Sequence, residues 1–274
     1  MTINCRGQLI DLTSPKVMGI LNVTPNSFYD GNRYNSEKLI LNQVEKMLAE
    51  GATFIDVGAH SSKPNAALVS PEEEANRLIP VLKVVLKHFP DTILSIDTFR
   101  STIAKMSLDC GAAMVNDISA GTLDKNMFKV VSEYLVPFVM MHMRGTPQTM
   151  NSLTNYDAIV KELIFYFSER IAVARSYGII DLIIDPGFGF AKTLDQNYEV
   201  LQKLDLLQNL DLPILVGVSR KSMAYKPINA TADEALNATS VLHTIALTKG
   251  ASLLRVHDVK EAVECVKLYE KLKN

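Results

Sequence analysis

The residues best suited to chemistry stand at positions 219–222, where two hydroxyls and two cations follow an apolar run. Ser219 and Ser222 flank Arg220 and Lys221, and a helical pattern comes next. Backbone N–H groups and cations at the start of a helix favour binding of an anion or an aromatic carboxylate. The pattern therefore predicts an anion site, with a solvated Lys-Arg pair as the alternative interpretation.

A second basic pair, Arg255 and His257, ends another apolar run. Alternate residues of a strand point to the same face, so the two side chains should lie together. Two cationic donors side by side suit a diphosphate, and barrel enzymes often bind phosphate near their last two strands. His257 could instead partner or cap the helix that follows.

Two carboxylates, Asp97 and Asp185, end apolar runs of strand length. Burial of an unpartnered carboxylate is costly, so these residues have little value for structure alone. A carboxylate can accept two parallel hydrogen bonds from the N–H groups of an amidine-like ring. Helix capping is the alternative for each. Residues 186–189 delay the next helix and present Phe190, which faces the same site or belongs to the core.

Further polar or soft residues end other apolar runs. Asn22 and Asn116 can donate and accept at once, so they can read the edge of a heterocycle or offer an oxygen to a hard cation. A turn is the alternative for both. Asp56 is expected to have a structural role and to hold a neighbouring backbone in place. Met141 can pack against a flat ring, and His142 is a weaker candidate because single histidines usually belong to the core.

The sequence contains no zinc signature, P-loop, GxGxxG or nucleophile elbow. The candidate ligands are oxygen donors, which favour Mg²⁺ bridging a phosphate over zinc or iron.

These residues must be brought together by the elements that carry them. Eight short apolar runs each end at a polar residue, and each is followed by a helical pattern. Strand and helix alternating in this way predict one (β/α)₈ TIM barrel over residues 1–274, whose strand ends meet at one mouth. The expected strands are 17–22, 53–56, 93–97, 113–116, 137–142, 182–185, 214–220 and 252–257.

The helices follow from apolar periodicity and end signals. We expect Gly51 to end the first helix, and Ser70 and Pro71 to begin the second as part of a capping box with Glu73. Asp258 and Glu261 are candidates to cap the last helix. Residues 3–12 should form an extended segment that covers the bottom of the barrel. The expected helices are 37–50, 71–89, 99–110, 124–135, 156–177, 195–204, 232–249 and 258–272.

Composition limits the class of protein. The chain has 274 residues, 47% of them hydrophobic, which suits one barrel with a large core. The net charge of −2 gives no reason to expect a nucleic acid or membrane partner. Cys5, Cys110 and Cys265 are widely spaced, which predicts a reducing, cytoplasmic setting, and no signal peptide is apparent.

Taken together, the motifs resemble those of dihydropteroate synthases. Eight segments match in the order typical of that family, and they span the chain. They are GILNVTPNSFYDG (19–31), DVGAHSSKP (56–64), SIDTFR (95–100), VNDISAG (115–121), MHMRGTP (141–147), DPGFGFAKT (185–193), GVSRKS (217–222) and RVHDV (255–259).

The resemblance implies a homodimeric barrel that acts in folate synthesis and is a target of sulfonamides. It implies joining of hydroxymethyl-dihydropterin diphosphate to p-aminobenzoate by dissociative substitution at the pterin methylene, with release of diphosphate. The implied pterin ligands are Asp97, Asn116, Met141, Asp185 and Lys221. The implied diphosphate ligands are Asn22, Ser62, Arg255 and His257, with Mg²⁺ at Asn22. The implied surroundings of the p-aminobenzoate ring are Phe28, Pro64, Phe190 and Lys221, with its carboxylate near Ser222. Lys63 and Ser219 are further expected substrate-binding residues.

Our mechanistic hypothesis expects catalytic contributions from several charged groups, Asp185 and Lys221 among them. Arg255, His257 and Mg²⁺ would stabilise the departing diphosphate, while Asp97 and Asp30 would favour the pterin cation. The chain departs from the family pattern at Asn26, Lys63 and Asn65, which bears on the geometry of the first two loops.

Three other functions fit parts of the pattern. A folate-dependent methyltransferase of the same superfamily would share the pterin-reading carboxylates, but it would need neither the 219–222 motif nor the basic pair. A catalytically inactive pterin-binding protein would bind without releasing diphosphate. A Schiff-base aldolase would use Lys221, but the adjacent Arg220 disfavours it.

Overall fold

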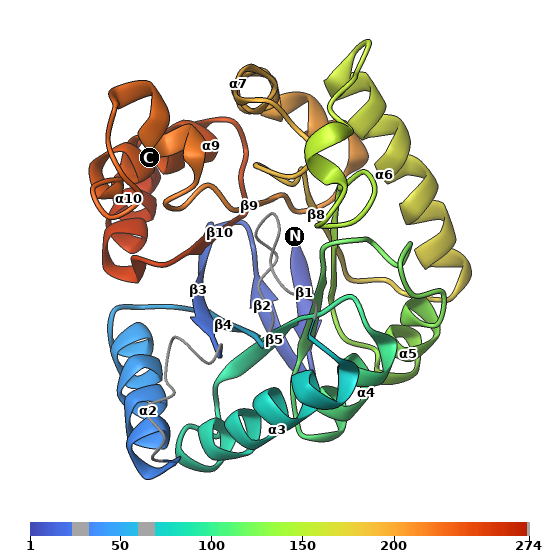
Figure 1. Cartoon of the computed structure of the whole chain (residues 1–274), viewed down its shortest axis with the longest axis vertical. Coiled ribbons are helices and arrows are strands. Elements are labelled where there is room, and N and C mark those ends of the chain that lie inside the picture. The colour runs from blue at the N-terminus through green and yellow to red at the C-terminus, as the bar shows by residue number, and fades with distance from the viewer. Residues whose placement is uncertain (24–32, 60–68, 273–274) are drawn as a thin grey trace.

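The computed structural model describes residues 1–23, 33–59 and 69–272. Eight parallel strands form a barrel in the order β8-β7-β6-β5-β4-β3-β10-β9 (Figure 1). An isolated parallel bridge between Ile184 and Ile214 brings the two ends of this order together, so the barrel nearly closes. The predicted (β/α)₈ fold is confirmed. The strands are β3 (Lys16–Asn22), β4 (Phe54–Gly58), β5 (Ile93–Asp97), β6 (Met114–Asp117), β7 (Phe138–Met141), β8 (Leu182–Asp185), β9 (Leu215–Val216) and β10 (Leu253–Val256).

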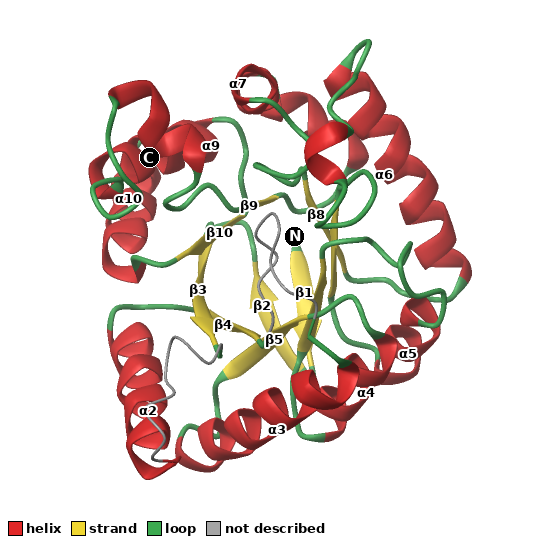
Figure 2. Ribbon diagram, viewed as in Figure 1, coloured by secondary structure: helices red, strands yellow, loops and turns green. Residues whose placement is uncertain are grey.

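Helices surround the strands (Figure 2). Each expected helix is present, with ends within four residues of the prediction. The α-helices are α2 (Arg33–Ala49), α3 (Pro71–His88), α4 (Ser101–Asp109), α5 (Met127–Tyr134), α6 (Ile159–Ser176), α7 (Leu194–Gln202), α8 (Ser222–Tyr225), α9 (Leu236–Thr248) and α10 (Val259–Lys271). No helix among these described residues is long and apolar enough to cross a membrane.

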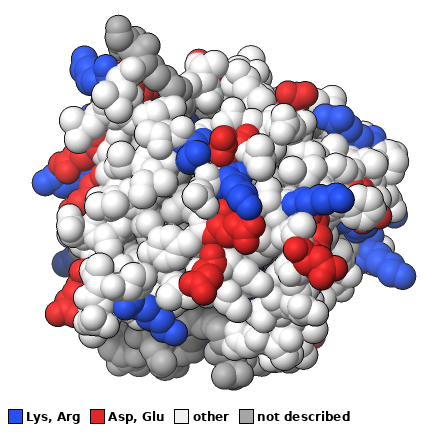
Figure 3. All heavy atoms as spheres, turned by 90° about the horizontal axis from the view of Figure 1, so that it is seen from above, with Lys and Arg blue, Asp and Glu red and all other residues white. Residues whose placement is uncertain are grey.

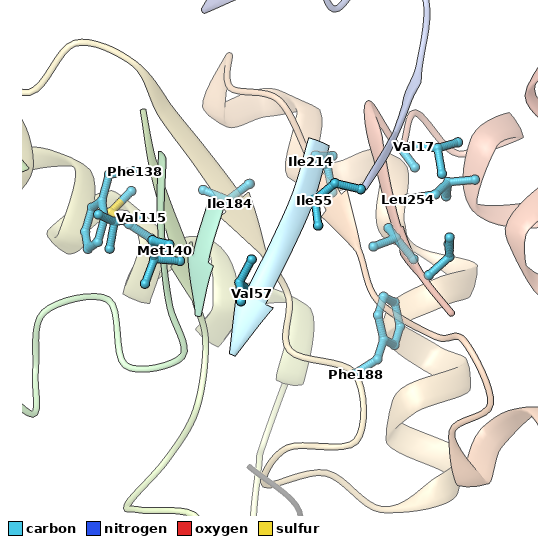
Figure 4. Packing of buried hydrophobic residues seen from close by; sticks show 14 of the residues in the cluster. Val17, Ile55, Val57, Val115, Phe138, Met140, Ile184, Phe188, Ile214 and Leu254 are labelled. Atoms are coloured by element: carbon cyan, nitrogen blue, oxygen red, sulfur yellow. The ribbon is translucent and has the colours of Figure 1, made fainter. Parts of the chain in front are cut away.

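The largest part of the core lies between strands and helices. Outward-facing strand residues such as Ile55, Val57 and Val115 are fully buried against the helix ring. Figure 4 labels all three among the buried side chains of this cluster. This shell fixes where each strand ends, and therefore where its last polar residue lies.

A two-stranded hairpin covers the bottom of the barrel. β1 (Thr2–Cys5) pairs antiparallel with β2 (Gln8–Asp11). Ile3 and Ile10 pack against inward residues near the starts of the barrel strands, including Met18 and Phe54. The expected cover over residues 3–12 is therefore present and takes the form of a hairpin.

Two local expectations need correction. At the start of α3, the Ser70 hydroxyl accepts from Glu73 N at 3.2 Å, but the Glu73 carboxylate forms an ion pair with Arg77. Asp258 occupies the N-cap position of α10 without a side-chain cap bond, because its carboxylate binds Arg220 instead. In both cases the carboxylate binds an arginine side chain instead of a backbone N–H group.

The seventh barrel strand is also shorter than predicted. β9 ends at Val216, whereas the apolar run continues to residue 220. Arg220 has a φ of 54°, in the left-handed region that no strand can include. The turn moves residues 219–222 out of the sheet and onto the mouth of the barrel.

Candidate active site

The inner face of the barrel changes from apolar to polar along the strands. The lower layer includes Met18, Phe54, Ile93, Met114, Val139, Ile183, Leu215 and Leu253. Alternate residues of a strand share a face, so residues two positions further along also point inward. These next inward residues include Asp56, Ser95, Asn116, Met141, Asp185 and Arg255. Charged groups therefore line the barrel on the side of the strand ends.

Arg255 is the centre of a charged network that joins strands of the barrel. Its Nε donates to Asp56 Oδ2 at 2.6 Å, and its Nη2 donates to Asp97 Oδ2 at 2.7 Å. Asn116 Nδ2 also donates to Asp56 Oδ2, at 3.0 Å. Burial opposes the charge of Arg255, but Asp56 and Asp97 outweigh it and raise the pKa of Arg255. The guanidinium therefore stays charged.

Asp56 was expected to hold a neighbouring backbone, but in the structure it binds two side chains. It is fully buried, and its Oδ2 accepts from both Asn116 and Arg255. Asp97 lies on β5 next to Gly58 of β4, where an added Cβ would come within 3.3 Å of the Asp97 Cβ. The glycine leaves room for Asp97 beside the arginine.

Asp185 and Lys221 form a second pair of opposite charges. Asp185 is 5% exposed, and its Oδ1 accepts from Gly187 N at 2.7 Å. Burial raises the pKa of Asp185, and Lys221 counteracts this effect. Burial lowers the pKa of Lys221 to about 8, while Asp185 opposes that change. A titratable cation and a desolvated carboxylate thus share one side of the mouth.

Lys221 also contacts the loop after β8. Its Nζ donates to Phe188 O at 2.5 Å and lies 5.0 Å from the centroid of the Phe190 ring. Phe190 itself is 8% exposed and packs with Met141 in an apolar cluster. The cluster has the members Ile118, Met141, Met143, Met150, Phe190 and Ala191. Phe190 therefore combines a core role with a place beside the charged groups.

The basic segment 219–222 divides into two parts. Arg220 donates from Nε and Nη2 to Asp258 at 2.9 and 2.8 Å, so its planar fork is occupied by a carboxylate. In the structure Arg220 therefore forms an ion pair with Asp258, and its contribution to an anion site stays a prediction. Lys221 turns towards the barrel axis instead, and Ser222 begins the short helix α8.

Ser219 and His257 contact each other at the rim. The Ser219 hydroxyl lies 3.0 Å from His257 Nδ1 and accepts from His257 N at 3.1 Å. His257 is exposed, whereas Ser219 is 4% exposed. Asn22 is also exposed, at the end of β3. The structure thus places Asn22 and His257 at the outer edge and Arg255 deeper in the barrel.

One buried group was missed by sequence reasoning. Lys192 is 9% exposed, and its Nζ lies 3.1 Å from Nδ1 of His142. A lysine next to a helix start carries no signal of burial in the sequence, because its surroundings depend on how the preceding loop folds. His142 is buried, as expected for a histidine that belongs to the core.

Other predicted residues cannot be placed. These residues, which lie outside the described part of the chain, are Asn26, Phe28, Asp30, Ser62, Lys63, Pro64 and Asn65. Among the residues that are described, no three or more His, Cys, Asp or Glu side chains gather as a metal site.

Comparison with known proteins identifies the family. Residues 18–257 match the family model described as pterin binding enzyme. Dihydropteroate synthase from Escherichia coli strain K12 is 40% identical over 272 residues, with 98% of this chain and 96% of the relative covered. The Synechocystis enzyme of the same name is 40% identical over 259 residues, with coverage of 93% and 89%.

Solved structures agree with this relationship. Yersinia pestis dihydropteroate synthase in a sulfonamide drug complex has a TM-score of 0.93 and 38% identity, covering 100% of this chain and 99% of that one. The Xanthomonas albilineans enzyme with 4-aminobenzoic acid has a TM-score of 0.92 and 34% identity, with 99% and 98% covered. In complex with 7,8-dihydropteroate it has a TM-score of 0.88 and 32% identity, with 100% and 99% covered. The chain therefore belongs to the dihydropteroate synthase family of pterin-binding enzymes.

Proposed function

We propose that this chain is a dihydropteroate synthase, a transferase that joins 6-hydroxymethyl-7,8-dihydropterin diphosphate to p-aminobenzoate and releases diphosphate. One observation carries the proposal. Strand ends that are distant in the sequence bring Asp97, Asn116, Asp185 and Arg255 to the inner face of the barrel at its mouth. This set combines acceptors for a ring rich in N–H groups with a cation that stays charged.

The pterin would lie against the deeper groups. Asp185 is fixed through Oδ1 by Gly187 N and can accept from the exocyclic amine and ring N–H of the pterin. Asn116 can read another edge, since an amide both donates and accepts. Lys221 would exchange its bond with Phe188 O for a bond with the pterin carbonyl or ring nitrogen.

The arylamine would lie towards the apolar cluster. Met141 and Phe190 offer it a flat, buried surface. Its carboxylate would rest near Ser222, where α8 begins. A sulfonamide that mimics p-aminobenzoate would compete for the same place.

The diphosphate would occupy the outer part of the mouth. Arg255 supplies a cation that Asp56 and Asp97 hold in one orientation, and His257 adds a donor at the rim. As the carbon–oxygen bond breaks, negative charge grows on the diphosphate, and fixed cations stabilise that change most. Asp97 stabilises the positive charge left on the pterin, and the neutral arylamine then attacks the methylene.

Mg²⁺ is proposed as a cofactor because the available donor atoms are oxygens. Asn22 offers a single amide oxygen at the exposed end of β3. Mg²⁺ usually keeps several waters and binds few protein oxygens together with substrate phosphates, so such a sparse donor set suits it. When bound, Mg²⁺ would neutralise charge on the diphosphate.

Two further features are proposed for the protein in the cell. A homodimer is supported by exposed apolar side chains on or next to the adjoining helices α9 and α10: Val241 and Ile245 on α9, Leu268 on α10, and Leu272 directly after α10. A cytoplasmic location is supported by the cysteines, which are free thiols at positions 5, 110 and 265.

A coupled assay for diphosphate release tests the function. With the pterin diphosphate and Mg²⁺, release should require p-aminobenzoate, and dihydropteroate should accumulate in equal amount. Pterin binding without diphosphate release would identify an inactive binding protein and refute the proposal.

A further inference from the structure

Lys192 is a buried lysine that the chemistry above does not use. It precedes α7 and is 9% exposed. Its Nζ donates to the carbonyl oxygens of Gly187 and Phe190, each at 3.1 Å, and lies 3.1 Å from Nδ1 of His142. These acceptors equal in number the donors of an ammonium group, so a protonated Lys192 is fully satisfied.

Burial and the charges around Lys192 determine the pKa values of Lys192 and His142. Burial lowers the pKa of Lys192 to about 7; Asp185 opposes this effect, while Lys221 and Arg144 add to it. Burial also holds the pKa of His142 well below its usual range, so the ring is neutral and can accept at Nδ1. A protonated Lys192 can therefore donate to the ring as well as to the two carbonyl oxygens, and this ammonium form is lost as pH rises through about 7.

The loop that Lys192 holds begins at Asp185. His142 N donates to Asp185 O at 2.9 Å, and Gly187 N donates to the Asp185 carboxylate at 2.7 Å. Gly187 has a φ of 70°, and a Cβ there would lie 2.1 Å from His142 O. The loop is thus pressed against the end of β7, and its position sets the position of the carboxylate.

A second lysine holds the opposite side of the same loop. Lys221 Nζ donates to Phe188 O, but the proposed function requires Lys221 to turn to the pterin. That bond cannot hold the loop while substrate is bound. Lys192, together with a bond from the Tyr156 hydroxyl to Ala191 O at 2.9 Å, would remain in place.

We propose that Lys192 is a positioning residue for the reaction. Its ammonium fastens residues 187–190 to the end of β7, so that Asp185 and Phe190 keep one arrangement when Lys221 engages the pterin. The inference rests on the proposed function for its substrates, but the loop can also be measured without any substrate.

The first test compares Lys192→Met with Lys203→Met. Lys203 is an exposed lysine that pairs with Glu199 on α7 and is distant from the loop carbonyls, so it controls for loss of a positive charge. In Lys192→Met, the Kd for the pterin should rise about tenfold or more, because small misplacement of binding groups is costly. Amide hydrogen exchange over residues 187–191 should accelerate without ligand. Lys203→Met should change neither quantity.

A second pair of variants keeps the proposal testable if Lys192→Met does not fold. His142→Leu removes the ring acceptor, whereas His142→Asn places an amide oxygen near the position of Nδ1. The Leu variant should weaken pterin binding and accelerate loop exchange, and the Asn variant should stay close to the original protein. Equal behaviour of the two variants would overturn the proposal.

A purely structural role predicts a different result. Lys192→Met would then lower the melting temperature, but the folded variant would keep the original Kd and loop exchange, and this outcome also refutes the inference. If the unaltered protein bound the pterin and released no diphosphate, the proposed function alone would fail. The binding and exchange comparisons would still decide the role of Lys192.

Discussion

At the scale of single residues, the site depends on a cation that two carboxylates hold. Arg255 lies between Asp56 and Asp97, with which it forms short charged hydrogen bonds. A buried ion pair contributes little net stability, but removal of one partner leaves the other charge unpaired and costs about 3–5 kcal/mol. We infer that the network serves chiefly to orient Arg255 and Asp97 for the substrate.

Arg255→Ala should therefore affect both activity and stability. We expect a large fall in kcat/KM, because the diphosphate loses its deepest cation, and a lower melting temperature, because Asp56 and Asp97 lose their partner. Steady-state kinetics and thermal unfolding measure the two effects. Arg255→Lys, which keeps the charge without the planar fork, should recover part of the stability and little activity. If Arg255→Ala kept turnover within about twofold of the original protein, the assignment of Arg255 to the diphosphate site would be refuted.

Lys221 gives the reaction a dependence on pH. Burial lowers its pKa to about 8, so the ammonium that should donate to the pterin is lost as pH rises through that value. We expect the affinity for the pterin, measured by calorimetry, to fall above about pH 8. Lys221→Arg stays protonated and should show no loss at that pH, although its larger group should bind more weakly overall. An affinity of the original protein that stays constant to pH 9 would contradict this assignment.

Residue types at the strand ends were predictable, but their partners were not. Asp97, Asn116, Asp185 and Arg255 stand where apolar runs end, and strand alternation alone turns them inward. Their pairing depends on register between strands that are far apart in sequence, which no local pattern contains. Lys192 was missed because its acceptors are loop carbonyls, whose positions also depend on the folded chain and not on a local pattern.

At the scale of elements, the two ends of the barrel have separate tasks. The β1–β2 hairpin covers the apolar layer at the bottom, while Asp185 at the end of β8 and Lys221 in the segment after β9 lie at the mouth. Changes in the hairpin should therefore alter stability and leave substrate binding unchanged.

Adjacent hairpin residues provide a matched test of this separation. Ile10 is 8% exposed and Leu9 is 71% exposed. Ile10→Ala should lower the free energy of unfolding by about 2–5 kcal/mol, whereas Leu9→Ala should change it little. Urea unfolding measures the difference, and both variants should keep the KM values of the original protein. A changed KM in a folded Ile10→Ala would show that the hairpin influences the mouth.

Helices and strands were predicted correctly where hydrophobic periodicity determines the structure. The prediction failed where the contacts of a single side chain or a local turn determine it. The strand and helix runs follow hydrophobic spacing, so most ends were close. The length of β9 was overestimated because Gly217 and Val218 continue the apolar run in the sequence, whereas the strand ends at Val216. Asp258 was expected to cap α10, but Arg220 lies within reach only in the folded chain.

At the scale of the whole molecule, neither the net charge nor the face shown in Figure 3 provides a broad positive field. The face shown in Figure 3 carries basic and acidic side chains interspersed, in keeping with a net charge of −2. In the proposed function, a diphosphate would be attracted by Arg255 and its neighbours at the mouth rather than by a broad field. Exposed apolar groups on α9 and α10 are the more informative surface feature.

Val241→Asp should convert the proposed homodimer into monomers. Val241 on α9 is 52% exposed, and burial of a carboxylate in an apolar interface without a partner is costly. Phe165→Asp on α6, where Phe165 is 66% exposed, changes an apolar side chain of comparable exposure on another helix and should leave the dimer intact. Sedimentation equilibrium measures the mass of each variant. A monomeric original protein would refute the dimer, and a dimer retained by Val241→Asp but lost in Phe165→Asp would place the interface on α6.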